Sequence, residues 1–290
     1  MVTRKRLLFV INPISGGKGK SNFPDLIRSN LDSDLFDHEV YWWDQVDELE
    51  GRLRQFITDN GDTVVAVGGD GTVNLIAKEL VNTSVTLAIV PMGSGNGLAR
   101  ELDLKLDPAS AIRALNKGQV GRMDVGYLNG NQFVNVAGWG FDAQVSVAFS
   151  KIKKRGLQSY IKSIYQEFKS ARNYQFTVEY ENGSIQKEGF MLTVANGTQW
   201  GNNFFVAPDA SYSDGWLDIV FLKKPGVLQI PGLVWSLFRK KDHHLMSRIR
   251  LKKATISSDE LIYTHLDGEP GEPCKEIQLS IQDSALSLLV

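Results

Sequence analysis

Residues 62–74 of this chain, Asp-Thr-Val-Val-Ala-Val-Gly-Gly-Asp-Gly-Thr-Val-Asn, limit its fold more than any other stretch. The apolar, β-branched run Thr63–Val67 has the composition of a strand that is buried on both faces. The glycines after it allow a tight turn, because they carry no Cβ. A helix is predicted to begin at Thr72 or Asn74, since apolar residues then recur at helical spacing.

The glycine turn at residues 68–71 is a candidate phosphate site. Backbone N–H groups at a helix N-terminus point outward, the helix dipole favours negative charge, and absent side chains let a phosphate approach closely. Asp70 is unexpected there, because its carboxylate repels a phosphate unless Mg²⁺ lies between them or backbone donors hold the acid. The alternative is a strand-to-helix connection whose glycines only allow close packing.

Two more glycine-rich loops also follow predicted strands. Residues 12–21 follow the strand Leu7–Ile11, and residues 91–100 follow the strand Val85–Val90. The first loop is not a Walker A motif, because Ile14 stands where that motif needs glycine; its N–H groups with Lys18 or Lys20 can still bind phosphate, or it is only a flexible basic loop. The second loop does not fit G-x-G-x-x-G. Ligands of parallel sheets bind at the carboxyl ends of strands, so three loops at such ends together favour phosphate binding.

Two different patterns divide the chain near residue 121. Before it, helical and strand patterns alternate, which indicates an α/β domain with a parallel sheet. After it, short strands follow one another through turns such as Asn129-Gly130, which indicates a β-rich domain. The elements predicted outside the glycine loops are helices at 23–31, 46–60, 108–117 and 157–171, and strands at 38–43, 125–128, 132–136, 175–180, 190–195 and 217–222.

Composition narrows the class of protein. The 290 residues suit one large domain or two, and a net charge of −1 gives no basic field for nucleic acid. The single cysteine, Cys274, excludes an internal disulfide. No apolar run approaches the roughly 20 residues of a membrane span. We therefore expect a cytoplasmic protein.

Two segments of the second half have a functional and a plainer interpretation. The apolar run Val227–Phe238, followed by Arg239-Lys240-Lys241, fits a membrane-surface helix. Helical core stripes are more common, so we expect a core helix with a solvated basic end. Leu266–Pro270 places two carboxylates around a turn glycine, and such acids are usually only solvated.

Several motifs, in their order along the chain, resemble those of the lipid kinase family of diacylglycerol and sphingosine kinases, in the NAD kinase-like superfamily. The resemblance covers nearly the whole chain. It implies a Rossmann-like α/β ATP-binding domain at residues 1–120, a β-sandwich domain at residues 121–290 whose last residues can return to the first domain, and an active site in the cleft between them. The motifs are Asn12-Pro13, Gly68–Asn74, Pro91–Asn96, Asn135–Asp142, Ala207–Asp218 and Leu266–Glu269.

The resemblance also implies a reaction, the ATP- and Mg²⁺-dependent phosphorylation of a lipid hydroxyl on a diacylglycerol or a sphingoid-type lipid. Asp267 becomes the general base with Glu269 as helper or alternative, and Asp70 reaches Mg²⁺ through water. A structural Mg²⁺ is implied at the carboxylate of Asp214 and the carbonyls of Ser211 and Trp216. The implied ATP contacts are Asn12, Pro13, Ser15, Gly16, Trp42, Gly68, Gly69, Asp70, Gly71, Thr72, Asn74, Gly93, Ser94 and Asn96.

Four features depart from the family's pattern. Leu75 and Gly97 stand where relatives often carry an acid, Trp42 stands where they often carry threonine, and Gly201-Asn202-Asn203 replaces a run of glycines. The departures at Leu75, Gly97 and residues 201–203 leave the identity of the lipid open, and the one at Trp42 concerns the nucleotide contact.

Two rival functions remain. An NAD kinase shares the Gly-Gly-Asp-Gly motif, and a non-catalytic nucleotide-binding membrane adaptor needs no base. Leu266–Glu269 and the aromatic-basic stretch favour a lipid kinase over the first rival, and the retained acids Asp70 and Asp267 argue against the second. The expected partners are a lipid substrate and, transiently, the inner membrane surface, with a homodimer left open.

Overall fold

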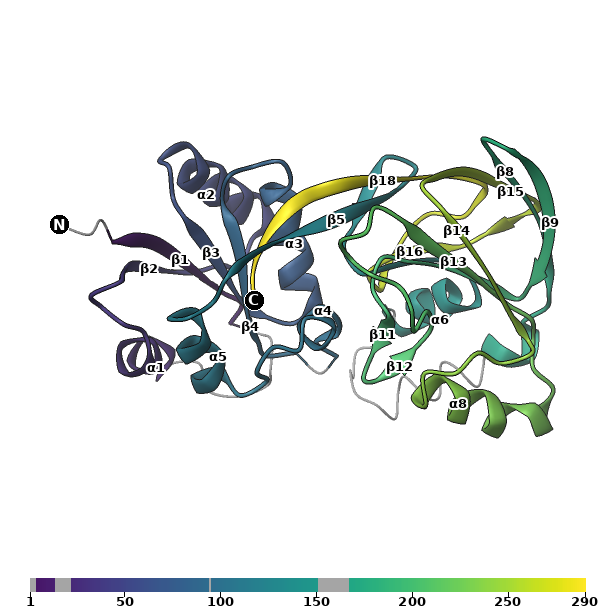
Figure 1. The fold of residues 1–290 in the computed structure, drawn as a ribbon, viewed down its shortest axis with the longest axis horizontal. Helices are drawn as coiled ribbons and strands as arrows, with labels where there is room; N and C mark the ends of the chain where they lie inside the picture. Colours follow the sequence, from purple (N-terminus) through teal and green to yellow (C-terminus); the bar gives the residue numbers. More distant parts are fainter. Residues whose placement is uncertain (1–3, 14–21, 94, 151–166) are drawn as a thin grey trace. The chain divides into compact units, whose positions relative to one another are not determined.

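The computed structural model describes residues 4–13, 22–93, 95–150 and 167–290 (Figure 1). The chain forms two compact units, residues 1–124 with 284–290, and residues 125–283. It passes between the units twice, within strand β5 (Val120–Leu128) and within strand β18 (Cys274–Leu289). The sheets and helices confirm the predicted α/β class.

The first unit contains a parallel sheet in the order β2–β1–β3–β4–β18. All residues of β3 and β4 are buried, as the composition of β3 predicts. At one edge, Ser287 and Leu288 of β18 pair with Thr86 and Leu87 of β4. The first four strands are β1 (Lys5–Ile11), β2 (Phe36–Trp42), β3 (Thr63–Gly68) and β4 (Thr86–Pro91).

Helices cover this sheet because its central strands are apolar on both faces. Helices α1 (Phe23–Asn30) and α5 (Pro108–Leu115) share one apolar cluster with β1, β3 and β4. Helix α2 (Val46–Thr58) contacts α3 (Asp70–Leu80), which lies against β3 and β4. Helix α3 begins at Asp70, earlier than predicted, because Gly69 already occupies the N-cap position.

The second unit is a β-sandwich, as predicted. One sheet has the order β14–β13–β10–β7–β16–β17, and the other runs β18–β15–β8–β9. Side chains from both sheets meet in one core, where the rings of Trp139 and Phe176 lie 5.3 Å apart. The strands are β6 (Asn131–Phe133), β7 (Val136–Gly140), β8 (Tyr174–Tyr180), β9 (Gly183–Gly189), β10 (Met191–Ala195), β11 (Gln199–Gly201), β12 (Phe204–Phe205), β13 (Leu217–Leu222), β14 (Met246–Leu251), β15 (Lys253–Ile262), β16 (Thr264–Leu266) and β17 (Glu269–Pro270).

The second unit differs from the sequence-based prediction at one strand and one helix, and one predicted helix falls largely outside the described residues. The single strand predicted at 132–136 is wrong, because β6 ends at Phe133 and residues 134 and 135 are not in a strand before β7 begins at Val136. The helix predicted at 157–171 lies mostly outside the described residues, which are helical over 167–170. Helix α6 (Phe141–Ser150) was not predicted.

The apolar run at 227–238 forms a 3₁₀ turn, η2 (Val227–Gln229), and helix α8 (Ile230–Phe238). The expected core helix is only partly correct, because its buried residues are Leu233, Ser236 and Leu237 alone. Among the described residues, no helix is long and apolar enough to cross a membrane.

Candidate functional site

The three glycine-rich loops follow neighbouring strands of the first unit. Strand β3 pairs in parallel with both β1 and β4, with Val67 beside Ile11 and Gly68 beside Pro91. Parallel strands end at the same edge of a sheet, so the described starts of the three loops, at residues 12, 69 and 92, lie at that edge. Trp42 pairs with Ile11 and therefore ends at this edge too. Of the predicted ATP contacts, Ser15, Gly16 and Ser94 lie outside the described residues.

The second and third loops touch through two glycines. A Cβ added to Gly93 would lie 2.6 Å from the Cα of Gly69, and one added to Gly69 would lie 3.1 Å from the Cα of Gly93. A Cβ on Gly68 would collide with the side chain of Thr72. The glycines therefore do allow close packing, and the same bare backbone is what a phosphate site requires.

Side-chain hydrogen bonds hold the shape of these loops. Asn96 adopts a left-handed conformation with a φ of 50°, and its side-chain amide accepts from Gly93 N and donates to Gly93 O, both at 2.8 Å. Asn12 Nδ2 donates to Thr72 Oγ1 at 3.1 Å, which joins the first loop to α3. Asn96 and Asn12 therefore shape the backbone that surrounds the predicted phosphate position.

Asp70 joins the second loop to the third. Its Oδ1 accepts from the backbone N–H of Gly97 at 2.6 Å, at the start of helix α4 (Gly97–Glu101). A Cβ on Gly95 would lie 2.9 Å from Asp70 Oδ2. Burial raises the pKa of Asp70, and backbone N–H groups, led by that of Gly97, act against the rise. Backbone donors therefore hold this acid, which is one of the two explanations that the sequence allowed.

Asp267 is the centre of a second arrangement, in the turn between β16 and β17 of the second unit. Its Oδ1 accepts from Asn135 N at 2.8 Å and from Val136 N at 2.9 Å, and its Oδ2 accepts from Val134 N at 2.8 Å. Its own N–H donates to Val136 O at 2.7 Å. Burial raises the pKa of Asp267, and these three N–H donors oppose the rise. Glu269, in β17, is exposed.

A buried histidine supports this turn. His265 Nδ1 accepts from the N–H of Gly268 at 3.2 Å, and His265 Nε2 lies 3.1 Å from Asp142 Oδ2. The backbone N–H of Gly268 can only donate, so Nδ1 must be the unprotonated, accepting nitrogen of the ring. The ring proton is therefore assigned to Nε2, which donates to Asp142. Thr193 Oγ1 donates to the same carboxylate oxygen at 3.2 Å. A side chain on Gly138 would collide with both ring and carboxylate, so glycine makes room for the pair.

The predicted structural Mg²⁺ site contains an ion pair instead of open ligands. Asp214 Oδ2 binds the guanidinium of Arg250, and Asp214 Oδ1 accepts from Trp216 N at 3.1 Å. The same guanidinium lies 3.3 Å from the buried Asp218. Within the described residues, no three His, Cys, Asp or Glu side chains form a metal-binding group. Arg250 therefore engages the one predicted carboxylate ligand in this structure, and the Mg²⁺ site at Ser211, Asp214 and Trp216 stays a prediction.

Two family profiles match the chain along most of its length. The diacylglycerol kinase catalytic domain matches residues 6–128, and the YegS C-terminal NAD kinase beta sandwich-like domain matches residues 135–290. The chain belongs to the diacylglycerol kinase family. It is therefore a lipid kinase, as the motifs predict.

Curated members of the diacylglycerol kinase family are similar over most of both chains. The diacylglycerol kinase of Staphylococcus saprophyticus is 27% identical over 276 residues, covering 92% of this chain and 90% of the relative. That of Staphylococcus aureus is 25% identical and covers 92% and 87%. A diacylglycerol kinase crystal structure from Bacillus anthracis shares the fold, with a TM-score of 0.76 at 20% identity over 100% of this chain and 97% of that one.

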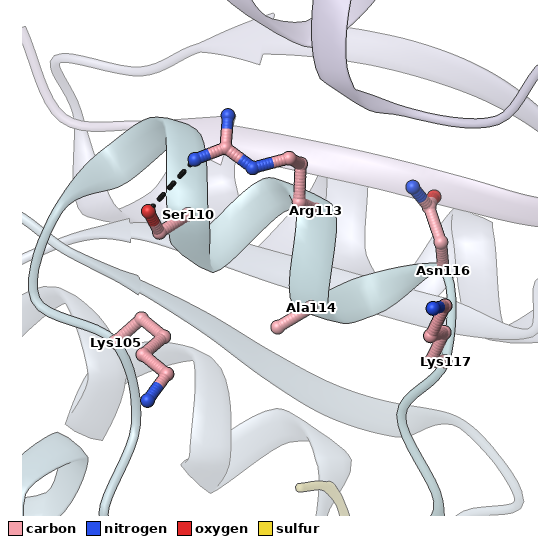
Figure 2. Close-up of a pocket in the computed structure, with 6 residues that line it drawn as sticks. All are labelled: Lys105, Ser110, Arg113, Ala114, Asn116 and Lys117. Carbon is pink, nitrogen blue, oxygen red and sulfur yellow. Dashed lines mark hydrogen bonds between the residues drawn. The ribbon is translucent and has the colours of Figure 1, made fainter.

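One cavity of this lipid kinase lies away from all the predicted site residues. It has a volume of about 440 Å³ and lies along α5 (Figure 2). Arg113 at its wall donates to Ser110 Oγ at 2.8 Å and to Asn30 Oδ1 at 2.6 Å. It is lined by Lys105, Ser110, Arg113, Ala114, Asn116 and Lys117. The cavity is basic, but Arg113 is already engaged by its own surroundings.

Sequence reasoning missed the His265–Asp142 pair. Asp142 ends one of the family motifs, and His265 stands two positions before Asp267, but the sequence gives no sign that the two meet. The one available signal is Gly138, which stands inside a buried strand where a larger residue packs better. Such a glycine indicates that another group approaches the backbone closely.

Proposed function

We propose that this lipid kinase transfers the γ-phosphoryl group of ATP, bound with Mg²⁺, to a lipid hydroxyl, and that diacylglycerol is its substrate. The observation that carries the proposal is the state of Asp267, a carboxylate held by three backbone N–H groups with a pKa above its ordinary value. The names of the curated relatives support diacylglycerol over sphingoid lipids.

The glycine loops of the first unit are the proposed ATP site. Phosphoryl transfer needs positioned phosphates and charge stabilisation more than covalent help from the protein. Backbone N–H groups around Gly69 and Gly93 supply dipoles, and close approach is open because neither residue has a side chain. Trp42, 41% exposed at the same edge, is proposed to contact the nucleotide base.

Asp267 is proposed to accept the proton of the attacking lipid hydroxyl. A carboxylate oxygen can accept about two hydrogen bonds, and Oδ2 accepts only one of the three backbone bonds. One acceptor position on Oδ2 therefore remains for the substrate. A raised pKa brings the base closer to neutral pH, which improves proton transfer. Glu269 is exposed and remains the proposed helper.

Mg²⁺ is proposed to enter as part of the ATP complex, where it neutralises phosphate charge. The carboxylate of Asp70 fits a water-mediated contact, because Oδ1 accepts from the start of α4 while Oδ2 faces Gly95 in the third loop. Asp70 would then hold both the loop backbone and the hydration shell of the cation. The reaction is proposed to take place at the inner membrane surface, where the lipid lies.

Radiolabel transfer tests the proposal. The full chain is incubated with γ-labelled ATP and Mg²⁺, and separately with detergent-dispersed diacylglycerol, monoacylglycerol, phosphatidylglycerol, sphingosine, ceramide, or NAD. We expect label in the phosphate of diacylglycerol. Label in sphingosine or ceramide phosphate would change the substrate, and label in NADP alone would make the protein an NAD kinase. ATP binding without any transfer would favour the non-catalytic adaptor.

A further inference from the structure

Helix α8 and the 3₁₀ turn η2 before it carry large apolar side chains that are exposed to solvent. Leu228 of η2 is 96% exposed and Val227 is 76% exposed, and in α8 Trp235 is 55% and Phe238 47% exposed. Val234, one turn before Phe238, is exposed as well, and the part of the Phe238 ring that is covered packs against Phe204, with 4.3 Å between the ring centres. We call Val227, Leu228, Val234, Trp235 and Phe238 the α8 surface; helix α8 is labelled in Figure 1.

The opposite side of α8 anchors the helix. Leu233 and Leu237, one turn apart, are buried in a cluster with Phe190, Met191 and Leu222 of the sandwich. Helix α8 is therefore apolar on both sides, and the described residues of its own unit bury one of them. Single exposed leucines are ordinary, but five neighbouring apolar side chains on one helical segment indicate a binding surface.

Three cations stand at the end of this surface. Arg239, Lys240 and Lys241 are all exposed, and none forms an ion pair within the described ranges. Arg239 and Lys241 lie over the ring of Trp235, at 5.3 and 5.7 Å from its centre. The following acid, Asp242, already pairs with Arg248. The charge beside the α8 surface is therefore positive, although the whole chain has a net charge of −1.

We infer that the α8 surface docks this protein on an anionic phospholipid membrane, an inference that rests on the proposed lipid kinase function. Apolar side chains enter the boundary between headgroups and acyl chains, the amphipathic Trp235 lies at that boundary, and the cations meet lipid phosphates. A second copy of the chain is a poor occupant, because a symmetric contact through this surface would bring two clusters of three cations together.

Vesicle sedimentation of the full chain tests this inference without ATP. Vesicles of phosphatidylcholine are compared with vesicles of phosphatidylglycerol and phosphatidylcholine in equal parts. We expect binding to the anionic vesicles that weakens with added salt, since surface charges are screened. The double variant Leu228→Ser/Trp235→Ser should bind at least about tenfold more weakly. Lys240→Gln/Lys241→Gln should lose about fivefold for each charge removed.

Matched controls come from elsewhere in the same unit. Leu261 is 66% exposed on β15, and Lys253 and Lys275 are exposed lysines. Leu261→Ser and Lys253→Gln/Lys275→Gln should bind as the wild type does. Equal binding by the α8 variants and these controls would overturn the inference, as would absence of binding by the wild type. Quenching of Trp235 fluorescence by brominated lipid, referenced to Trp235→Phe, should confirm insertion.

Activity measurements separate this inference from the proposed function. On a short-chain diacylglycerol dispersed as monomers, the α8 variants should keep the wild-type kcat, and on vesicles they should lose activity in parallel with binding. A protein that binds vesicles through α8 but phosphorylates no lipid would refute the proposed function alone. An active kinase whose α8 variants work normally on vesicles would refute the docking surface alone.

Discussion

Asp70 in the first unit and Asp267 in the second are both carboxylates that backbone N–H groups hold, but the donors differ in origin. Those of Asp70 belong to the start of a helix, in a neighbouring loop that touches its own loop through Gly69 and Gly93. Those of Asp267 come from a break between two strands, residues 134–136.

The difference shows which groups form the candidate site in each unit. In the first unit the backbone N–H groups form the proposed binding site, and side chains such as Asn96 and Asp70 hold that backbone in its conformation. In the second unit one side chain is presented by a turn, and that turn depends on another side chain, His265. Substitutions in the two units should therefore fail in different ways: ATP binding in the first and turnover in the second.

Asp267→Asn should have the largest effect. Loss of a general base, the role proposed for Asp267, lowers kcat by about 10²–10⁴-fold. ATP affinity, measured by calorimetry, should remain nearly unchanged because the loops proposed to bind ATP belong to the other unit. Glu269→Gln is the matched control and should keep most of its activity. If Glu269→Gln is the inactive variant, the assignment of the base moves to Glu269.

His265→Ala should lower kcat by about 100-fold, the cost of misplacing a reacting group by about 1 Å, without weakening ATP binding. His265→Asn places an acceptor near the position of Nδ1, whereas His265→Gln replaces only Nε2. Because the turn is held through Nδ1, the Asn variant should recover more activity than the Gln variant. Equal kcat values with equal losses of melting temperature would reduce His265 to a packing residue.

Gly93→Ala should damage the first unit. Its new Cβ would lie 2.6 Å from a backbone atom of Gly69, so the loops must separate. Overpacking of this kind costs about 1–3 kcal/mol, and ATP affinity should fall by about tenfold or more. Gly51→Ala, in α2 with open space around it, is the control and should stabilise the fold by about 0.5–1 kcal/mol. Normal ATP binding by Gly93→Ala would remove this contact from the site.

The smallest expected effect is on the pH dependence of the free energy of unfolding, to which Asp70 and Asp267 both contribute. Burial raises the pKa of both carboxylates above the ordinary value of about 3.9. The stability that each contributes is then fully present below the unfolded pKa and is lost as pH rises through the folded pKa. In urea unfolding, the wild type should lose stability relative to Asp70→Asn, and relative to Asp267→Asn, as pH rises above about 4. The opposite slope would mean that the backbone donors outweigh burial.

Local patterns predicted most of the first unit from sequence. The run Thr63–Val67 is apolar without interruption, so its identity as a buried strand does not depend on distant residues. The neighbouring positions of the glycine loops follow from the rule for parallel sheets. The contacts of Asp70 with Gly97 do not follow, because they require two loops to be folded against each other.

The second unit was harder because its decisive bonds join distant residues. The strand predicted at 132–136 is interrupted where its N–H groups bind Asp267, more than 130 positions later. The periodicity of residues 227–238 likewise could not show which side of α8 the sandwich covers. Leu233 and Leu237 are buried while Trp235 and Phe238 are exposed, although all four are large aliphatic or aromatic residues in one run of the sequence.

The pairing of β18 with β4 has a consequence for how the protein is made. A ribosome completes β1 to β4 early, but Ser287 and Leu288, which cover the open side of β4, emerge after the whole sandwich. Until then β4 presents unpaired N–H and C=O groups to other chains. The unit that is synthesised first is thus completed last, and in the interval its exposed strand edge is open to pairing with other chains.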